Sequence, residues 1–480
     1  MLKLKNIQPE RVFYYFEQIC DIPHGSGNMG GVSRYCRNFA INHGFDYYKD
    51  EANNVIIYKP ASAGYENAEP VILQGHLDMV CQKDDGVEID FLEDGIEPYV
   101  DGDFVKARGT TLGADNGIAV AMMLAILEDD SLKHPPIEAV FTTEEEVGMI
   151  GARQLDMTRL KGRRMVNIDA EEADIVTVSC AGGSDFTVEI PLERVEKQGT
   201  MVQLSLKGLK GGHSGIEING NRINADILAG RILNHLARDN AFDIASIDGG
   251  DKGNAIPNSC KIVLCADCTD ALVKAANEYI EIVKNEISDK EPDFEAQLEI
   301  IGEGTCSVFS EKAKSQTITT LACVPDGVMA MSAGVSGLVE TSLNLGILKT
   351  EADELKLHIT LRSNKWTALL ALEEKLTAFF ASQSLESNVF AKYPPWEYKA
   401  DSALRSLYVD IYKSTIGEEP GIAAIHAGLE CGVFAAAIKG FDCIAIGPYL
   451  YDVHTTKERV CISDTEKVYK MILKLLENLR

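Results

Sequence analysis

Two polar residues follow an apolar run near the start of the chain, where they could bind a metal ion. His76 and Asp78 come directly after residues 71–73, a continuous apolar run typical of a buried strand. In an extended chain, side chains two residues apart point the same way. His76 could therefore bind a metal while Asp78 orients its ring. The same pair could instead lie in an ordinary surface turn, and the local sequence leaves both interpretations open.

A glycine-rich segment contains a second candidate ligand, Asp115. Residues 109–117 hold three glycines, which indicate a backbone that another group must approach closely. The apolar stretch that follows, residues 118–127, predicts a buried helix. Asp115 could cap the start of this helix, which by position is the commoner role. Alternatively, its carboxylate could bridge two metal ions.

Further candidate ligands follow other predicted strands. Glu144–Glu146 come after the predicted strand 137–143. Adjacent carboxylates repel one another and normally face solvent, so in this place they require a cation. Asp169 also follows an apolar strand, and His454 follows a strand and a turn. Two histidines and three carboxylates, without cysteine, suit two divalent ions such as Zn²⁺, with Mn²⁺ or Co²⁺ as alternatives.

The predicted strands and helices follow two different sequence patterns. Apolar strands alternate with helices in the first and last thirds of the chain, which indicates an α/β sheet with helices on both faces. The last third closes with an apolar-periodic helix, for which Ser463 and Glu466 predict a capping box. The middle third contains strands with alternating polar and apolar residues, such as 202–206 and 355–359. Such strands suit a half-exposed antiparallel sheet with helices on its other face.

The composition limits the partners and the location. A chain of 480 residues exceeds one ordinary core, so at least two domains are expected. Its formal net charge of −27 argues against nucleic acid and anionic membranes as partners. The sequence shows no apolar run long enough to span a membrane and no signal-peptide pattern. Its 12 scattered cysteines suggest reduced thiols, and the expected location is cytoplasmic.

Taken together, these segments resemble a known family. The motifs HxD, GADNG, EEExG and NxDxEE and the late histidine, in this order and spacing, are similar to those of the M20 metallopeptidases. The segments TTLGADNGIA, GLKGGHSG, NAIP, VETSLNLG and IHAGLECG resemble the Xaa-His dipeptidase branch of that family. The similarity extends over nearly the whole chain.

The resemblance implies a fold and an activity. The fold would be a three-layer α/β catalytic domain with a mixed, zinc-peptidase-like sheet, built from residues 1–185 and 396–480. An inserted α+β lid domain would occupy residues 186–395. The activity would be metal-dependent hydrolysis of dipeptides, preferentially Xaa-His peptides such as β-alanyl-histidine. Within the same fold, the alternatives are a tripeptidase or an N-acyl amino acid deacylase. A catalytically silent metal-binding protein would require a broken catalytic set, and here every position of that set is filled.

The resemblance also assigns roles to individual residues. The metal ligands would be His76, Asp115, Glu146, Asp169 and His454, with Asp115 bridging the two ions. Asp78 would orient His76, and Glu145 would act as the general base. This alignment of the three glutamates with the family motif leaves Glu144 as a solvated neighbour. An error of one residue in the alignment is its main risk. A cis peptide bond between Asp115 and Asn116 is also implied.

Residues of the middle domain would contact the substrate. His213 would stabilise the tetrahedral intermediate, since in related enzymes the equivalent histidine reaches a catalytic site, often that of the partner subunit. Alternatively, His213 caps a helix that begins near Ser214. Asn254 and Arg362 would hold the carbonyl and the carboxylate of the peptide, although Arg362 could also be an ordinary residue on an edge strand.

A late segment adds the last candidates for substrate contacts. Gly428 and Glu430 would contact the substrate. Glu430 would accept a hydrogen bond from the free amine of the peptide, an assignment that rests on charge complementarity alone. A homodimer formed through the lid domain is a family expectation. The partner otherwise expected is the small peptide substrate itself.

Overall fold

The computed structural model describes residues 3–480, which form two compact units. Unit 1 extends to Cys180 and includes Trp396–Ala424 and Leu429–Arg480. Unit 2 comprises Ala181–Pro395 and the short segment Ile425–Gly428. The second unit therefore begins at Ala181 instead of residue 186, and it includes four residues from the last third of the chain.

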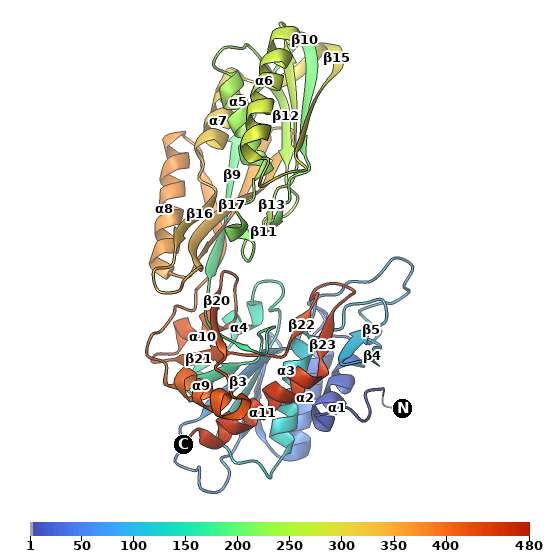
Figure 1. The fold of residues 1–480 in the computed structure, drawn as a ribbon, viewed down its shortest axis with the longest axis vertical. Helices are drawn as coiled ribbons and strands as arrows, with labels where there is room; N and C mark the ends of the chain where they lie inside the picture. The colour runs from blue at the N-terminus through green and yellow to red at the C-terminus, as the bar shows by residue number, and fades with distance from the viewer. Residues whose placement is uncertain (1–2) are drawn as a thin grey trace. The chain divides into compact units, whose positions relative to one another are not determined.

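Unit 1 is built on a mixed sheet, as expected (Figure 1). Within residues 3–480 this sheet has eight strands in the order β1-β2-β6-β3-β7-β21-β8-β20. Their bounds are β1 Asp46–Lys49, β2 Val55–Lys59, β3 Val71–His76, β6 Ile137–Thr142, β7 Arg164–Asn167, β8 Ile175–Cys180, β20 Gly421–Ile425 and β21 Asp442–Ala445. The neighbours β6, β3, β7 and β21 are parallel, whereas β1 with β2, β2 with β6 and β21 with β8 are antiparallel.

Helices cover both faces of this sheet. All six residues of β3 and all six of β6 are buried, and because side chains alternate along a strand, both faces must be covered. Helix α3 packs on β3 and α1 on α3, while α9 and α10 contact β21 and α11 contacts α9. The helices of unit 1 are α1 Glu10–Cys20, α2 Gly30–His43, α3 Ala114–Glu128, α4 Ile150–Gln154, α9 Ala403–Ile416, α10 Cys431–Ala437 and α11 Ile462–Asn478. These layers confirm the predicted α/β architecture.

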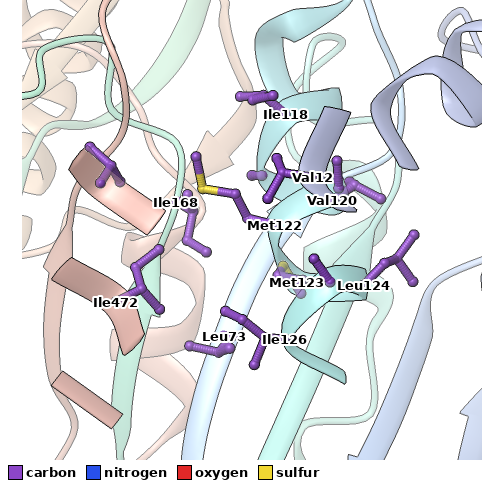
Figure 2. Packing of buried hydrophobic residues seen from close by; sticks show 14 of the residues in the cluster. Val12, Leu73, Ile118, Val120, Met122, Met123, Leu124, Ile126, Ile168 and Ile472 are labelled. Atoms are coloured by element: carbon purple, nitrogen blue, oxygen red, sulfur yellow. The ribbon is translucent and has the colours of Figure 1, made fainter. Parts of the chain in front are cut away.

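Helix α3 lies at the centre of the unit 1 core. Its side chains from Gly117 to Leu127 are buried, so the helix is apolar on every side. Figure 2 shows Met122 and Ile126 of α3 beside Leu73 of β3 and Ile472 of α11, which belong to one hydrophobic cluster. The first and last thirds of the chain therefore share a single core.

The predicted capping box at the last helix is wrong. Helix α11 begins at Ile462, its N-cap residue is Cys461, and the side chain of that residue makes no cap hydrogen bond. Ser463 lies inside the first turn, and its hydroxyl donates to Asp103 Oδ2 at 2.5 Å. The serine therefore ties the helix to a neighbouring loop instead of closing its own end.

Unit 2 is an antiparallel sheet with helices, as the alternating strands predict. Within the described residues the sheet has nine strands in the order β15-β10-β14-β12-β17-β18-β9-β19, with β16 paired to β17. The strands are β9 Gly182–Pro191, β10 Arg194–Lys207, β12 Asp243–Gly249, β14 Cys260–Ala266, β15 Glu295–Phe309, β16 Gly327–Met331, β17 Val339–Thr350, β18 Glu354–Ser363 and β19 Ser387–Tyr393. The helices are α5 Ala225–Leu236, α6 Thr269–Ile287, α7 Glu311–Cys323 and α8 Trp366–Ser382.

Two small sheets complete the described chain. One has the order β22-β23-β5-β4 in unit 1, and the other pairs β11 with β13 in unit 2. Their strands are β4 Pro98–Asp101, β5 Phe104–Ala107, β22 Leu450–Tyr451, β23 Arg459–Cys461, β11 Gly212–His213 and β13 Ala255–Ile256. No helix within residues 3–480 combines the length and apolar composition needed to cross a membrane.

Candidate metal centre

The parallel strands of unit 1 bring the predicted ligands to one edge of the sheet. Parallel neighbours have their carboxyl ends at the same edge, where sites form in α/β sheets. His76 is the last residue of β3, Asp169 follows β7 by two residues, and Glu146 follows β6 by four. His454 lies in the loop between β22 and β23. The strands thus deliver side chains from distant parts of the sequence to one place.

Asp115 lies at the centre of this cluster. Ligand atoms of His76, Asp115 and Glu146 all lie within 4.8 Å of one another. The two carboxylate oxygens of Asp115 face different imidazoles, since Oδ1 is 3.2 Å from His76 Nε2 and Oδ2 is 3.2 Å from His454 Nε2. Asp169 Oδ1 lies 3.4 Å from His76 Nε2, and Glu146 Oε2 lies 3.0 Å from His454 Nε2. The five residues therefore form two groups, each with one histidine and two carboxylates, and Asp115 belongs to both groups.

Asp115 does not cap α3, so the commoner interpretation of its position is wrong. The N-cap residue is Gly113, which has no side chain with which to make a cap hydrogen bond, and the Asp115 carboxylate makes none either. Asp115 and Asn116 have non-helical backbone angles, and the implied cis peptide bond between them is present. The carboxylate of Asp115 points instead toward the two histidines.

The charges of the cluster favour a cation. Hydrogen bonds to Asp115 and Glu146 raise the pKa of His454 to about 11, although burial opposes them. Burial lowers the pKa of His76, but Asp169 and Asp115 outweigh it and bring that pKa well above its usual value. Both imidazoles are thus strongly stabilised in the protonated, positively charged form, as expected where three carboxylates surround two histidines. A divalent ion held by imidazole nitrogens and carboxylate oxygens meets the same need.

Asp78 connects His76 to the glutamate segment. Its carboxylate accepts hydrogen bonds from the backbone N–H of Glu145 at 3.0 Å and of Glu146 at 3.3 Å, and from Ser26 Oγ at 2.9 Å. His76 Nδ1 lies 3.0 Å from the backbone oxygen of Asp78, and 3.6 Å from its carboxylate. The ring is therefore oriented through the backbone of Asp78, which leaves Nε2 to face the cluster.

The three adjacent glutamates face different surroundings. Glu144 has a φ of +54°, and its carboxylate accepts a hydrogen bond from Gly27 N–H at 3.0 Å. Glu146 belongs to the ligand cluster through His454. Burial raises the pKa of Glu145 well above its usual value, and the nearby carboxylates of Asp169 and Glu430 add to this. These environments support the register in which Glu145 is the base and Glu146 the ligand.

Comparisons with known proteins identify the family. Residues 72–478 match the model of peptidase family M20/M25/M40. The chain belongs to this family. It is 36% identical to the cytosol non-specific dipeptidase of Escherichia coli, over 100% of this chain and 99% of the relative. It superposes on the crystal structure of the aminoacylhistidine dipeptidase of Vibrio alginolyticus with a TM-score of 0.90 and 36% identity, covering 99% of this chain and 98% of that one.

The M20 assignment makes the protein a hydrolase with the expected catalytic and lid fold. A tripeptidase from Staphylococcus aureus is also similar, with a TM-score of 0.58, 15% identity and coverage of 98% of this chain and 99% of that one. At this identity, the likeness shows the fold alone.

A buried polar network in this M20 peptidase includes residues of the strands that carry candidate ligands. Gln74 Nε2 donates to Glu430 Oε2 at 2.5 Å, Thr142 Oγ1 donates to the same oxygen at 2.6 Å, and Asn167 Nδ2 donates to Gln74 Oε1 at 2.6 Å. All four side chains are fully buried. Burial raises the pKa of Glu430 to about 8, and Glu430 Oε1 has no hydrogen-bond partner among the described residues.

The sequence interpretation missed most of this network. Only Glu430 was singled out, as a substrate contact. Gln74 and Asn167 each lie two residues before a predicted ligand, His76 and Asp169, so they share a face with it. That alternation is the signal that could have found them.

In unit 2, His213 lies at the end of β11. Its Nδ1 accepts hydrogen bonds from the backbone N–H groups of Gly215 and Ile216, both at 3.1 Å. In the neutral ring the proton must therefore be on Nε2. Within residues 3–480 no α-helix begins near Ser214, and the 3₁₀ helix Ile218–Gly220 has Glu217 as its N-cap residue, so His213 closes the turn that precedes this short helix instead of capping it.

Arg362 lies in β18, which has β17 on one side and β9 on the other, so it is not on an edge strand. Its side chain is 8% exposed, and Nη1 donates to Tyr393 Oη at 3.1 Å. Arg362 Nε has no hydrogen-bond partner among the described residues. His426 accompanies it in unit 2, where burial and the charge of Arg362 lower the pKa of His426 to about 3. A buried guanidinium beside a neutral imidazole suits an anion.

The other two candidates differ in burial. Asn254 is exposed in a turn before β13, and its backbone oxygen accepts a hydrogen bond from Ser214 N–H at 2.9 Å. Gly428 is half-buried at the end of the segment Ile425–Gly428.

Proposed function

We propose that this protein is a metal-dependent dipeptidase whose active centre holds two divalent ions. The observation that carries the proposal is the position of Asp115, between two imidazoles that each have a second carboxylate beside them. One ion would be held by His76, Asp115 and Asp169, and the other by His454, Asp115 and Glu146. Zn²⁺ is the preferred ion because it favours imidazole and carboxylate ligands, with Mn²⁺ or Co²⁺ as alternatives.

In the proposed mechanism, Glu145 moves the proton. The bound ions would supply Lewis acidity and an activated water. Glu145 takes the proton of the attacking water and passes it to the leaving amine, serving first as base and then as acid. Its burial supports this role, because a carboxylate with a raised pKa accepts a proton readily near neutral pH. Asp78 positions Glu145 by accepting its backbone N–H.

We further propose that residues of unit 2 bind the peptide. Arg362 would pair with the terminal carboxylate, since its Nε has no partner of its own. His213 would donate from Nε2 to the developing oxyanion, in keeping with the two backbone hydrogen bonds accepted by Nδ1. Asn254 and Gly428 would add contacts to the substrate, and Glu430 of unit 1 would accept a hydrogen bond from its amine.

The preferred substrates would be Xaa-His dipeptides such as β-alanyl-histidine. This rests on the likeness to the Vibrio enzyme, which is named for aminoacylhistidine peptides. The equally similar Escherichia coli enzyme is named a non-specific dipeptidase, so the breadth of specificity must be measured. Its description as a cytosol enzyme supports a cytoplasmic location. A homodimer through unit 2 is also proposed, to be tested by light scattering.

A substrate panel tests the function. Protein reconstituted with Zn²⁺ would be assayed on β-alanyl-histidine, Leu-Gly, Leu-Gly-Gly and N-acetyl amino acids. We expect hydrolysis of both dipeptides, with the larger kcat/KM for β-alanyl-histidine. Cleavage of Leu-Gly but not of any Xaa-His peptide would contradict the specificity. Cleavage of only the tripeptide or only the acyl amino acids would overturn the dipeptidase assignment.

A further inference from the structure

The carboxylate of Glu458 holds the backbone segment that carries Asp115. Its side chain is buried, with 3% exposed. Oε2 accepts the N–H groups of Leu112 at 2.7 Å and Gly113 at 3.0 Å, and Oε1 accepts those of Ala114 at 2.8 Å and Asp115 at 3.2 Å. Four consecutive backbone donors thus converge on one carboxylate, at the position where α3 begins.

This segment needs an acceptor from outside the helix. The first N–H groups of a helix have no partner within it. At α3, Gly113 has a left-handed φ of +71°, and Asp115 and Asn116 are non-helical, so the first turn is irregular. The usual remedy, a side chain at the N-cap position, is absent because that residue is a glycine. Glu458 replaces it, because its two carboxylate oxygens accept the backbone N–H groups at this end of the helix.

The same residue belongs to the segment that carries His454. Glu458 follows His454 by four residues, and its backbone N–H donates to Thr455 O at 3.1 Å. Directly after Glu458, β23 begins at Arg459 and pairs with β5. Glu458 is therefore fixed on both sides along the chain, and its carboxylate joins the loop of one candidate ligand to the loop of another.

We infer that Glu458 is a positioning residue for the metal centre. By holding the backbone of Asp115 from the loop of His454, it sets the distance between the shared carboxylate and the second imidazole, which is 3.2 Å here. It touches neither substrate nor ion and acts through the two ligands. This inference rests on the proposed two-ion centre. The only indication of this role in the sequence is that the glutamate follows a predicted ligand by four residues.

The chain provides a matched control in Glu138. This glutamate is also 3% exposed, and its carboxylate accepts the backbone N–H of Lys161 at 2.9 Å and of Gly162 at 3.0 Å. It lies near the amino end of β6, whereas the ligands lie beyond the carboxyl end. Glu138→Gln therefore disturbs the same chemistry in the same unit, away from the candidate centre.

The test measures Co²⁺ binding without any substrate. Metal-free wild type, Glu458→Gln and Glu138→Gln would be titrated with Co²⁺ alone, followed by calorimetry and by the visible absorption of the bound ion. We expect Glu458→Gln to bind Co²⁺ about 10- to 100-fold more weakly, with an altered spectrum, because lost supporting contacts typically have this effect. Glu138→Gln should keep the wild-type affinity and spectrum, even if its metal-free form melts earlier.

Two outcomes would overturn the inference while leaving the proposed function intact. One is wild-type affinity and spectrum in Glu458→Gln, and the other is equal weakening in Glu138→Gln. If Glu458→Gln does not fold, Glu458→Asp replaces it, because it keeps the carboxylate on a shorter side chain. This variant should fold and bind Co²⁺ at least tenfold more weakly than the wild type. Binding as tight as in the wild type would overturn the inference. Failure of the wild type itself to bind Co²⁺ would overturn the proposed function and this inference with it.

Discussion

At the scale of single residues, neighbours in the sequence have unlike roles because the backbone turns between them. Glu144 adopts a left-handed φ and binds Gly27, while Glu146 meets His454. Glu145 lies between them, with its N–H held by Asp78. The segment therefore places three identical side chains in three different surroundings, which suit a structural contact for Glu144, the proposed proton carrier for Glu145 and a candidate ligand for Glu146.

Exchanging two of these glutamates for glutamine tests that separation. Glu145→Gln should lower kcat by about 100- to 10,000-fold, because an amide cannot take the proton of water. Its KM and its affinity for Zn²⁺ should change little, since the ligands remain. Glu144→Gln is the matched control and should keep nearly full activity. Steady-state kinetics and metal analysis would decide, and the reverse result would place the register one residue earlier.

How far the centre could be predicted depends on where its residues lie. His76, Glu146 and Asp169 were predictable because histidine or acid directly after an apolar strand is conspicuous. The second layer was not, because Gln74 and Thr142 lie within the strands that they support. Single polar residues in a buried strand have several ordinary explanations, and only the distances to Glu430 distinguish among them.

At the scale of elements, the contact between β3 and α3 positions the centre. Asn116 at the start of α3 accepts the N–H of His76 through Oδ1 at 3.2 Å and donates through Nδ2 to Ile168 O at 2.8 Å. One amide thus joins the helix to two strands. Gly75 makes this approach possible, because a Cβ there would lie 2.5 Å from Asn116 Oδ1.

Gly75→Ala should therefore separate β3 from α3. The added methyl must displace Asn116, so we expect a loss of about 1–3 kcal/mol in the free energy of unfolding and much weaker Zn²⁺ binding. Gly421→Ala in β20 is the matched control, because its Cβ would make an ordinary 3.4 Å contact with Ile175. Denaturant unfolding and zinc titration measure both effects. Unchanged zinc affinity in Gly75→Ala would contradict the role given to this contact.

Helix α5 of unit 2 contains a buried acid, Asp226. The side chain is fully buried, and neither carboxylate oxygen has a hydrogen-bond partner among the described residues. Burial raises its pKa well above the usual value, although the nearby thiol of Cys260 opposes this, and the charges of Asp326 and Asp248 raise it further. Because the pKa of Asp226 is higher in the folded than in the unfolded protein, the folded state binds the proton more tightly. This contribution to stability is complete below the unfolded-state pKa of about 4 and is lost as the pH rises through the folded-state pKa.

Replacing this acid should stabilise the protein in a pH-dependent way. Asp226→Asn removes the ionisable group, so its free energy of unfolding should exceed that of the wild type at pH 8. The difference should shrink as the pH falls, and vanish below about pH 4, where the wild-type acid becomes protonated in both states. Asp270→Asn, at an exposed position in the first turn of α6, should show no such trend. Urea unfolding at several pH values measures it, and a difference that does not vary with pH would contradict the explanation.

The helices and strands, like the site residues, were predictable only where the local sequence carries a clear pattern. Strands with uniform apolar runs, such as β3 and β6, and helices such as α3 were identified because burial leaves a clear pattern. The long edge strand β15 was missed: its residues are mostly exposed or half-buried, and Gly302 and Gly304 interrupt it. The start of α11 was misplaced because Ser463 bonds to Asp103, a contact that local sequence does not reveal.

At the scale of the whole molecule, the candidate ligands all belong to unit 1, although they come from both ends of the chain. His76, Asp115, Glu146 and Asp169 precede unit 2 in the sequence, and His454 follows it. The candidate metal centre therefore joins the first of the three chain segments of unit 1 to its last, Leu429–Arg480, and all of unit 2 lies between these two segments in the sequence. An ion bound there would link those segments in the folded state only.

Removing the metal should therefore destabilise one unit selectively. An ion that binds only the folded state stabilises it by about 2.7 kcal/mol when its free concentration is 100 times Kd. Calorimetry of the chelator-treated protein should show an earlier transition for unit 1 and an unchanged transition for unit 2. Added Zn²⁺ should restore the first, and His454→Ala should reduce that shift because it removes the ligand supplied by the last segment of unit 1. Equal shifts of both transitions would mean that the ion stabilises more than unit 1, and no shift would mean that the cluster does not hold a metal in the folded protein.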